Sequence, residues 1–171
     1  KLVFMAVGAA GVLPLAAGTR VAVFGRSQFN YFKSGTGSGG LVNTAYVTGI
    51  LDALEADEDL EVDQGVKSIY EEWLKEHPFD AGSGWASEPG SYYLTDTEEE
   101  MIELVCDAFD RTIVLLNVGN IIDMRWVRRY GPSAVAYVWQ GGQEGGNGVL
   151  DVLKGTVNPS GKLPDTIPWN I

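Results

Sequence analysis

The sequence has very little of the chemistry that builds thiol, disulfide or zinc sites. Cys106 is the only cysteine and His77 the only histidine among the 171 residues, which excludes an intrachain disulfide and a zinc cluster built on cysteines. Cys106 lies on the apolar stripe of an expected helix, where a free cysteine usually packs as a small hydrophobe. Pro78 follows His77, which indicates a helix end. The pattern therefore favours structural roles for both residues over a catalytic pair.

Positive charge is also scarce. The chain has 12 Lys and Arg against 23 Asp and Glu, for a formal net charge of -11. This excess repels the phosphate backbone on which nucleic-acid affinity mainly depends, so we expect no nucleic-acid partner. The acidic residues are spread over 57–63, 71–76 and 96–103, which favours a solvated surface that keeps the protein soluble.

Long apolar runs are missing as well, because no segment reaches the roughly 18 apolar residues that a membrane-spanning helix needs. Residues 1–17 imitate the apolar part of a secretory signal, but Pro14 interrupts them and Lys1 is the only basic residue in front of them. We therefore expect a buried N-terminal helix and loop at 1–17 and no membrane association. The compartment is left open, with the cytoplasm slightly favoured.

What the sequence does contain is an alternation of short apolar runs with helical patterns. Thr95 and Glu98 have the spacing of a helix capping box, and residues 79–93 are rich in Gly, Ser and Pro and are expected to form a loop. The expected strands are 21–24, 60–62, 112–116 and 135–139, and the other expected helices are 45–56, 66–76, 126–130 and 149–153. This order predicts an α/β fold with a mostly parallel sheet covered by helices on both faces. Ligands of such sheets bind beyond the carboxyl ends of the strands, so the loops after Phe24, Leu116 and Trp139 are the candidate site.

The glycine loop at 35–40 has two interpretations. Its sequence fits the G-x-G-x-x-G pattern of dinucleotide-binding folds, and Asp63 follows at about the required distance. In that motif, however, the first glycine forms the turn at the strand end, whereas ten residues separate Gly25 from Gly35 here. Nucleotide binding is therefore a minor alternative, beside a purely structural turn.

Five segments together resemble the α/β sandwich domain that follows the catalytic barrel in family 3 glycoside hydrolases. They are 11–15, 21–25, 33–39, 139–146 (WQGGQEGG) and 158–164 (NPSGKLP), in this order. The segment from Asn117 to Trp126 is similar to the bacterial β-glucosidase branch. The resemblance covers nearly the whole chain and implies a three-layer α/β/α sandwich over residues 1–171 as a single domain, with the barrel absent from this chain.

The resemblance implies a retaining hydrolase in which the nucleophilic aspartate belongs to the barrel. The sequence offers no adequate metal-ligand cluster or phosphate-binding motif, so we expect chemistry without a cofactor or metal. The acid/base glutamate of many relatives precedes the segment that matches 91–96. Here only Pro89 and Gly90 separate Glu88 from Ser91. Compared with these relatives, the domain is therefore expected to be shorter by about one strand–helix unit. The usual acid/base position is then missing, and we expect the chain alone to be catalytically incomplete.

The resemblance also implies that the loop after the first strand reaches toward the sugar. Its candidate substrate-binding residues are Lys33, Ser34, Gly35, Thr36, Gly37 and Ser38. Tyr31, Phe32 and Trp85 could offer aromatic surface, although packing roles are favoured for them. Glu144 is a weak catalytic candidate, because its glycine-rich setting before a helix suits a turn equally well.

Three hypotheses for function follow. The first is a sandwich component of a β-glycoside hydrolase, β-glucosidase-like, with a β-linked glycoside and a catalytic barrel domain as partners. The second is a stand-alone carbohydrate-binding or scaffold module, and the third is a nucleotide-binding α/β domain. Without its barrel, the domain is expected to expose an apolar surface.

Overall fold

The computed structural model describes residues 3–5, 11–35, 43–78 and 92–167. The chain divides into two compact units. The first unit combines residues 1–13, 89–139 and 158–171, and the second combines 14–88 and 140–157. The prediction of a single domain over residues 1–171 stays a prediction.

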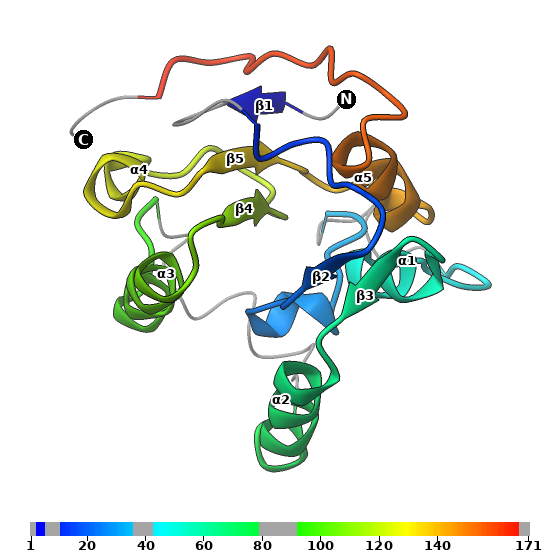
Figure 1. Ribbon diagram of the computed structural model, residues 1–171. Helices are drawn as coiled ribbons and strands as arrows, with labels where there is room; N and C mark the ends of the chain where they lie inside the picture. The colour runs from blue at the N-terminus through cyan, green and yellow to red at the C-terminus, as the bar shows by residue number, and fades with distance from the viewer. Residues whose placement is uncertain (1–2, 6–10, 36–42, 79–91, 168–171) are drawn as a thin grey trace. The chain divides into compact units, whose positions relative to one another are not determined.

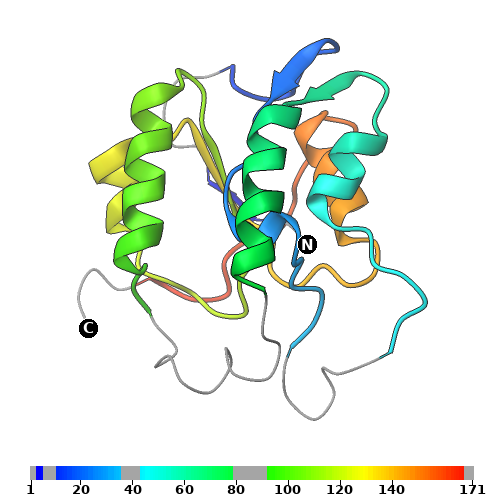
Figure 2. The same cartoon turned by 90° about the horizontal axis from the view of Figure 1, so that it is seen from below.

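The described part of the first unit contains a three-stranded sheet and two helices. The strands follow the order β1-β5-β4, in which β4 and β5 are parallel and β1 is antiparallel to β5 (Figure 1). Helices α3 and α4 lie side by side (Figure 2). The elements are β1 (Val3–Met5), α3 (Asp96–Ala108), β4 (Ile113–Leu116), α4 (Arg125–Tyr130) and β5 (Ala134–Tyr137).

Local sequence explains the ends of these helices. The Thr95 hydroxyl accepts a hydrogen bond from the Glu98 amide, and the Glu98 carboxylate accepts one from the Thr95 amide, which confirms the predicted capping box. At the other end of the unit, α4 stops at Gly131, whose φ of 62° is the left-handed conformation that glycine adopts most readily. Four consecutive buried residues make up β5, as expected for a strand covered on both faces.

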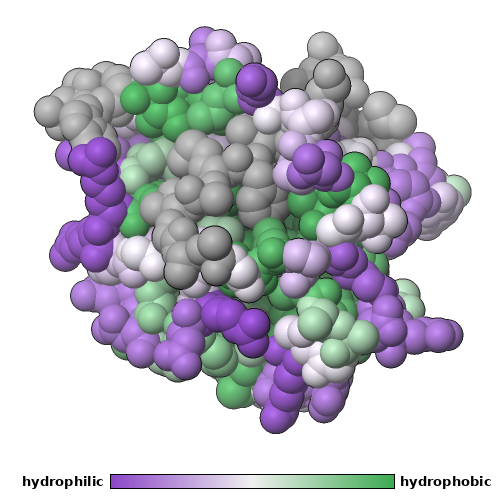
Figure 3. Space-filling model, turned by 45° about the horizontal axis from the view of Figure 1, so that its top comes forward, coloured by the Kyte–Doolittle hydropathy of each residue, from purple (hydrophilic) through white to green (hydrophobic). Residues whose placement is uncertain are grey.

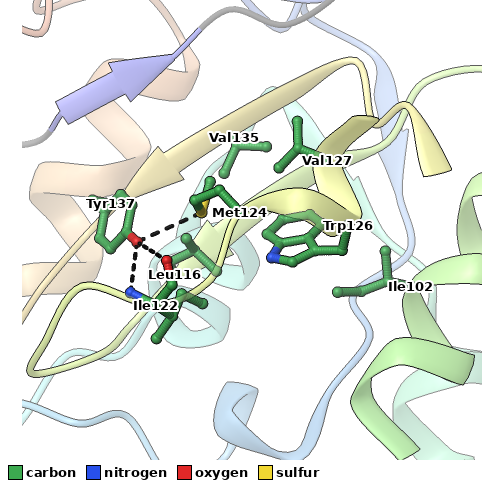
Figure 4. Packing of buried hydrophobic residues seen from close by; sticks show 8 residues of the cluster. All are labelled: Ile102, Leu116, Ile122, Met124, Trp126, Val127, Val135 and Tyr137. Carbon is green, nitrogen blue, oxygen red and sulfur yellow. Dashed lines mark hydrogen bonds between the residues drawn. The ribbon is translucent and has the colours of Figure 1, made fainter. Parts of the chain in front are cut away.

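The core of the first unit is built around Tyr137 and Trp126, which are 0% and 2% exposed (Figure 4). Both buried polar groups have partners. The Tyr137 hydroxyl accepts a hydrogen bond from the Ile122 amide at 3.1 Å, and the Trp126 indole donates to the Asp123 carbonyl at 2.7 Å. The cluster comprises Ile102, Leu116, Ile122, Met124, Trp126, Val127, Val135 and Tyr137.

The prediction of a helix within residues 1–17 is wrong for the described part. Val3–Met5 form strand β1, which pairs with β5 from Val3 opposite Tyr137 to Met5 opposite Val135, and 11–17 contain no helix. An apolar run of this length suits a helix or a strand, and pairing with a buried neighbouring strand decides for the strand.

Within its described residues, the second unit has two parallel strands, three α-helices and a short 3-10 helix. Strands β2 and β3 pair from Thr19 opposite Leu60 to Val21 opposite Val62, and α1 packs against α5 (Figures 1 and 2). The elements are β2 (Thr19–Val21), the turn η1 (Arg26–Gln28), α1 (Ile50–Ala56), β3 (Leu60–Val62), α2 (Gln64–Glu76) and α5 (Gly145–Leu153). Together with the parallel β4–β5 pair of the first unit, these elements confirm the predicted α/β class.

Boundaries in the second unit differ from the predictions in three places. The strand expected at 21–24 already ends at Val21, the helix expected from residue 45 begins at Ile50, and the helix expected from residue 149 begins at Gly145. The glycine-rich stretch predicts a break before residue 149, but Gly145 and Gly146 are buried in the first turn of α5. Packing rather than propensity sets this helix start.

Helix α2 is amphipathic but has no buried residue. Ile69 and Trp73 on its apolar face are 70% and 42% exposed. On the face of the molecule in Figure 3, which is coloured by hydropathy, hydrophobic residues in green lie beside hydrophilic residues in purple.

His77 caps the end of α2, where its ring stacks on Trp73 with centroids 4.3 Å apart, so the helix-terminating role predicted for it is confirmed. None of the helices in the described ranges is long and apolar enough to span a membrane.

Candidate functional site

Three loop segments of the second unit are joined by backbone hydrogen bonds and define the candidate site. The Gly142 amide donates to the Lys33 carbonyl at 2.9 Å, which links the loop after η1 to the glycine-rich segment 140–146. Thr48, just before α1, exchanges two bonds with the same segment: its amide donates to Gln143 at 2.8 Å, and its carbonyl accepts from Gly146 at 2.9 Å. Segments 31–35, 44–49 and 140–146 therefore form one connected surface.

Tyr31 is the side chain around which these segments close. Its hydroxyl accepts a hydrogen bond from the Gly141 amide at 3.1 Å. A Cβ added at Gly145 would lie 1.8 Å from that hydroxyl, and one at Gly141 would lie 2.2 Å away, so a larger residue at either position would displace the Tyr31 ring. Burial raises the pKa of Tyr31, and the Gly141 hydrogen bond opposes this in part, so the phenol is neutral at physiological pH. The packing role predicted for Tyr31 is therefore the one that the structure has.

The predicted substrate-binding loop is described in part. Lys33 donates from Nζ to the Thr44 hydroxyl at 2.7 Å, and a Cβ at Gly35 would lie 3.9 Å from the Gln140 side chain. Ser34, which lies between Lys33 and Gly35 in the chain, is half-buried. Thr36, Gly37 and Ser38 lie outside the described residues, as does Trp85. A sugar-binding role for this loop stays a prediction.

Glu144 is held by neighbouring side chains. It precedes α5 as the N-cap residue, and its two carboxylate oxygens accept hydrogen bonds from the Tyr46 hydroxyl and from Asn147 Nδ2, the latter at 2.6 Å. The hydrogen bond to Glu144 and its negative charge raise the pKa of Tyr46. Both oxygens are thus engaged in ordering the start of α5, which fits the structural interpretation of Glu144; its weak candidacy as a catalyst stays a prediction.

Other carboxylates singled out by the sequence have structural partners. Asp63, which would bind the ribose in a dinucleotide fold, accepts a hydrogen bond from the Val66 amide at 3.0 Å and pairs with Arg20 at 2.9 Å. It is the N-cap of α2, which explains its low pKa. Glu98 belongs to the capping box of α3, and Glu88 lies outside the described residues.

The loop after Leu116 belongs to the first unit and is hydrogen-bonded to Trp139, a residue with a strained backbone. Trp139 has a φ of 56°, the only positive value for a non-glycine residue in the described ranges. Asn117 donates from Nδ2 to the Trp139 carbonyl at 2.6 Å and holds this conformation. Trp139 immediately precedes Gln140 in the chain, where the glycine-rich segment of the site begins.

Thiol and metal chemistry find no support in the described part of the chain. Burial raises the pKa of the Cys106 thiol, so the thiol is protonated and a poor nucleophile. No group of three or more His, Cys, Asp or Glu among the described residues could hold a metal ion.

Comparison with known proteins relates this geometry to a family. The β-glucosidase of Ruminococcus albus is 42% identical over 202 residues, covering 94% of this chain and 21% of the relative. The crystal structure of a β-glucosidase from Paenibacillus barengoltzii matches with a TM-score of 0.89 and 39% identity over 99% of this chain and 23% of that one. The structure of β-glucosidase 3B from Thermotoga neapolitana, in complex with glycerol, matches with a TM-score of 0.82 and 28% identity over 98% of this chain and 29% of that one.

These matches have two consequences. The chain spans less than a third of the length of each of these relatives. The match to the Ruminococcus albus enzyme also runs over 202 residues, more than the 171 of the whole chain, so the relative has extra residues inside the matched region. The sequence model described as "Glycosyl hydrolase family 3 C-terminal domain" matches residues 8–171, and the chain therefore belongs to the C-terminal domain family of the family 3 glycosyl hydrolases.

Proposed function

We propose that this chain is the sugar-lining component of a β-glycoside hydrolase, and that it acts only together with a catalytic barrel domain. The observation that carries the proposal is the family membership over residues 8–171, combined with the connected surface of segments 31–35, 44–49 and 140–146. These segments place Lys33 and Ser34 beside the glycine-rich segment that the family resemblance marks as specific. The substrate is a β-linked glycoside.

The proposed division of labour follows from the chemistry of retaining hydrolysis. That reaction needs a carboxylate nucleophile and a second carboxylic acid about 5 Å from it. On the connected surface, Glu144 spends both oxygens on Tyr46 and Asn147, and Asp52 at the start of α1 accepts a hydrogen bond from the Gly49 amide at 2.8 Å. Both carboxylates fit structural roles. Both the nucleophile and the second carboxylic acid are therefore assigned to the barrel, and this chain supplies hydrogen-bonding groups and excludes water from the sugar.

The test is hydrolysis of aryl β-glycosides by the 171-residue chain alone and then with a barrel in trans. The barrel would come from the Paenibacillus barengoltzii enzyme after deletion of the region that matches this chain. We expect no turnover by either part alone and measurable turnover by the mixture. Turnover by the chain alone would refute the proposal and would make Glu144→Gln the first variant to measure.

Silence of both the chain and the mixture would favour the second candidate, a stand-alone carbohydrate-binding module. Glycoside binding by the isolated chain, without any barrel, would then be its signature. The nucleotide-binding alternative has less support, because β2 ends at Val21 and α1 begins only at Ile50, far from the glycine loop on both sides. Saturable binding of NAD or ATP would restore it.

A further inference from the structure

Strand β4 lies at one end of the three-stranded sheet of the first unit, and only its edge toward β5 pairs with a strand in the described part of the chain (Figure 1). On that edge, the Thr112 and Leu116 carbonyls accept hydrogen bonds of 3.2 and 2.9 Å from the chain at the beginning and just past the end of β5. The backbone groups of successive residues in a strand point to alternate sides. Ile113 and Leu115 therefore direct their amides and carbonyls away from β5, and these groups form the outer edge of β4.

The sequence of β4, Ile-Val-Leu-Leu, is typical of an interior strand. Natural edge strands often contain a charged residue, a proline or a bulge, each of which hinders the pairing of another strand. Strand β4 has no charge and no proline, and its register with β5 runs without a bulge from Ile113 opposite Ala134 to Leu116 opposite Tyr137. The outer edge of β4 therefore carries none of these obstacles to a further strand.

The side chains of β4 are only partly covered. Ile113, Val114 and Leu115 are half-buried, whereas all four residues of β5, which lies between two strands, are buried. Strands that pair in parallel and have a continuous apolar sequence are normally covered on both faces. A further strand beside β4 would cover the remaining apolar surface through cross-strand contacts between side chains.

The comparison of lengths favours a segment of polypeptide that this chain lacks as the occupant of the outer edge. The match to the Ruminococcus albus enzyme spans 202 residues and this whole chain has 171, so that enzyme contains residues within the matched region that have no counterpart here. A second copy of this chain suits the edge less well, because each copy has a net charge of -11 and the two copies repel each other. An uncharged segment meets no such repulsion.

We infer that the outer edge of β4 is a docking site for one extended, uncharged and mainly apolar segment, which adds to the sheet as a further strand. Main-chain hydrogen bonds to Ile113 and Leu115 supply affinity, and apolar side chains that pack on those of β4 supply selectivity. The site lies in the first unit, outside the connected surface of segments 31–35, 44–49 and 140–146. It therefore goes beyond the proposed function and does not depend on it.

The test uses the 171-residue chain and a synthetic peptide with the residues that the Ruminococcus albus enzyme has in excess within the matched region. Hydrogen exchange followed by NMR reports on each backbone amide separately. We expect saturable binding, with exchange at least about tenfold slower at the Ile113 and Leu115 amides and little change at Val114, whose amide faces β5.

Two results of this experiment would overturn the inference. One is the absence of saturable binding to the folded chain, or binding that leaves exchange at Ile113 and Leu115 unchanged. The other is protection of these two amides without peptide that grows with the concentration of the chain, because it would assign the outer edge to a second copy.

Two variants at one position supply the control. Leu115→Pro removes the amide on the outer edge together with the leucine side chain, whereas Leu115→Ala shortens the side chain and keeps the amide. Neither variant loses a hydrogen bond to β5, since the backbone of residue 115 faces away from it, and proline is tolerated at such edge positions. Leu115→Pro should bind the peptide at least about tenfold more weakly than Leu115→Ala.

Equal binding by Leu115→Pro and Leu115→Ala would also overturn the inference. Should Leu115→Pro fail to fold, Ile113→Pro and Ile113→Ala take the place of the pair, with the same expected difference. Residue 113 is the first of β4, a position at which proline is tolerated in strands.

Discussion

At the scale of single residues, the candidate site depends on glycines that face other parts of the backbone. A Cβ at Gly146 would lie 1.9 Å from the Gly49 carbonyl oxygen and 2.8 Å from that of Thr48. Neither atom is the end of a flexible side chain. The close approach lets the Gly146 amide bond to Thr48 and lets α5 pack on the start of α1. Position 146 therefore requires glycine because of its contact with the backbone of residues 48 and 49, and not because of a positive φ.

Gly146→Ala should consequently destabilise the protein by about 1–3 kcal/mol, because the backbone of residues 48–49 must move to make room. Gly148→Ala is the matched control. It lies in the same helix, is exposed, and has no atom within 4 Å of its added Cβ. There alanine should stabilise the helix by about 0.5–1 kcal/mol. Urea unfolding monitored by circular dichroism measures both, and equal effects of the two changes would contradict the contact argument.

The Tyr46–Glu144 hydrogen bond makes a prediction about titration. The protonated phenol is the donor, so its bond to the carboxylate raises the pKa of Tyr46, and the stabilisation is present at neutral pH and lost as pH rises through that raised pKa. Glu144→Gln should lower the pKa of Tyr46 toward its ordinary value. NMR of ¹³C-labelled tyrosine rings measures this. Tyr130, whose raised pKa has other causes, should not change.

At the scale of helices and strands, local signals were the most predictable. The capping box at Thr95 and Glu98 and the strand at 60–62 were predicted where they occur, because side-chain chemistry and a short apolar alternation specify them locally. The strand Val3–Met5 could not be distinguished from a helix by its sequence. Its conformation depends on pairing with β5, in which Val3 lies opposite Tyr137 and Met5 opposite Val135, far away in the chain. Helix α5 likewise starts early because of the Gly146 contact.

The capping box predicts the cost of removing its side chain. Thr95→Ala deletes the acceptor for the Glu98 amide and should lower the unfolding free energy by about 1 kcal/mol, which corresponds to roughly 2–4 °C in Tm. Thr97→Ala, in the exposed first turn of the same helix, is the control and should have a much smaller effect. Thermal melts decide the point, and a Tm for Thr95→Ala that equals that of Thr97→Ala would show that the cap contributes nothing.

The end of α5 is fastened to the turn before β3 by Lys154, whose Nζ contacts Asp57 at 2.6 Å and Asp59 at 2.8 Å. The hydrogen bond from Lys154 lowers the pKa of Asp57. A carboxylate with a lowered pKa stabilises the fold above its unfolded pKa of about 3.9, and this stabilisation is lost as pH falls through the lower folded value.

Lys154→Met should therefore lower Tm at neutral pH, and its difference from the unsubstituted chain should shrink as pH falls below about 4. Lys75→Met is the control, because Lys75 pairs with Glu72 at a fully exposed site where such pairs contribute little. Melts between neutral and acidic pH test the prediction. A Tm difference for Lys154→Met that stays constant over this range would point to lost packing instead of the ion pair.

At the scale of the whole molecule, the candidate site was predictable only in outline. The sequence motifs located the Lys33 loop and the glycine-rich segment, and the structure joins them through the Gly142 to Lys33 hydrogen bond. Such a site depends on tertiary contacts between segments more than one hundred residues apart, as with Tyr31 and Gly141.

The net charge of -11 predicts how salt changes the stability of the protein. Like charges repel one another more in the compact state than in the unfolded chain, and salt screens this repulsion over a Debye length of about 10 Å at 0.1 M. We expect Tm to rise when NaCl is increased from a few millimolar to about 0.15 M. Differential scanning calorimetry measures the change, and a fall in Tm over this range would mean that specific ion pairs such as Lys154–Asp57 outweigh the general repulsion.

The wedge formed by Tyr31 between Gly141 and Gly145 also constrains how this protein can change over generations. Because a methyl group at position 145 would lie 1.8 Å from the Tyr31 hydroxyl, alanine can be accommodated there only if the Tyr31 ring moves or a smaller residue replaces it. A change at either glycine therefore also changes the packing of Tyr31. A designer who wishes to reshape this surface meets the same restriction.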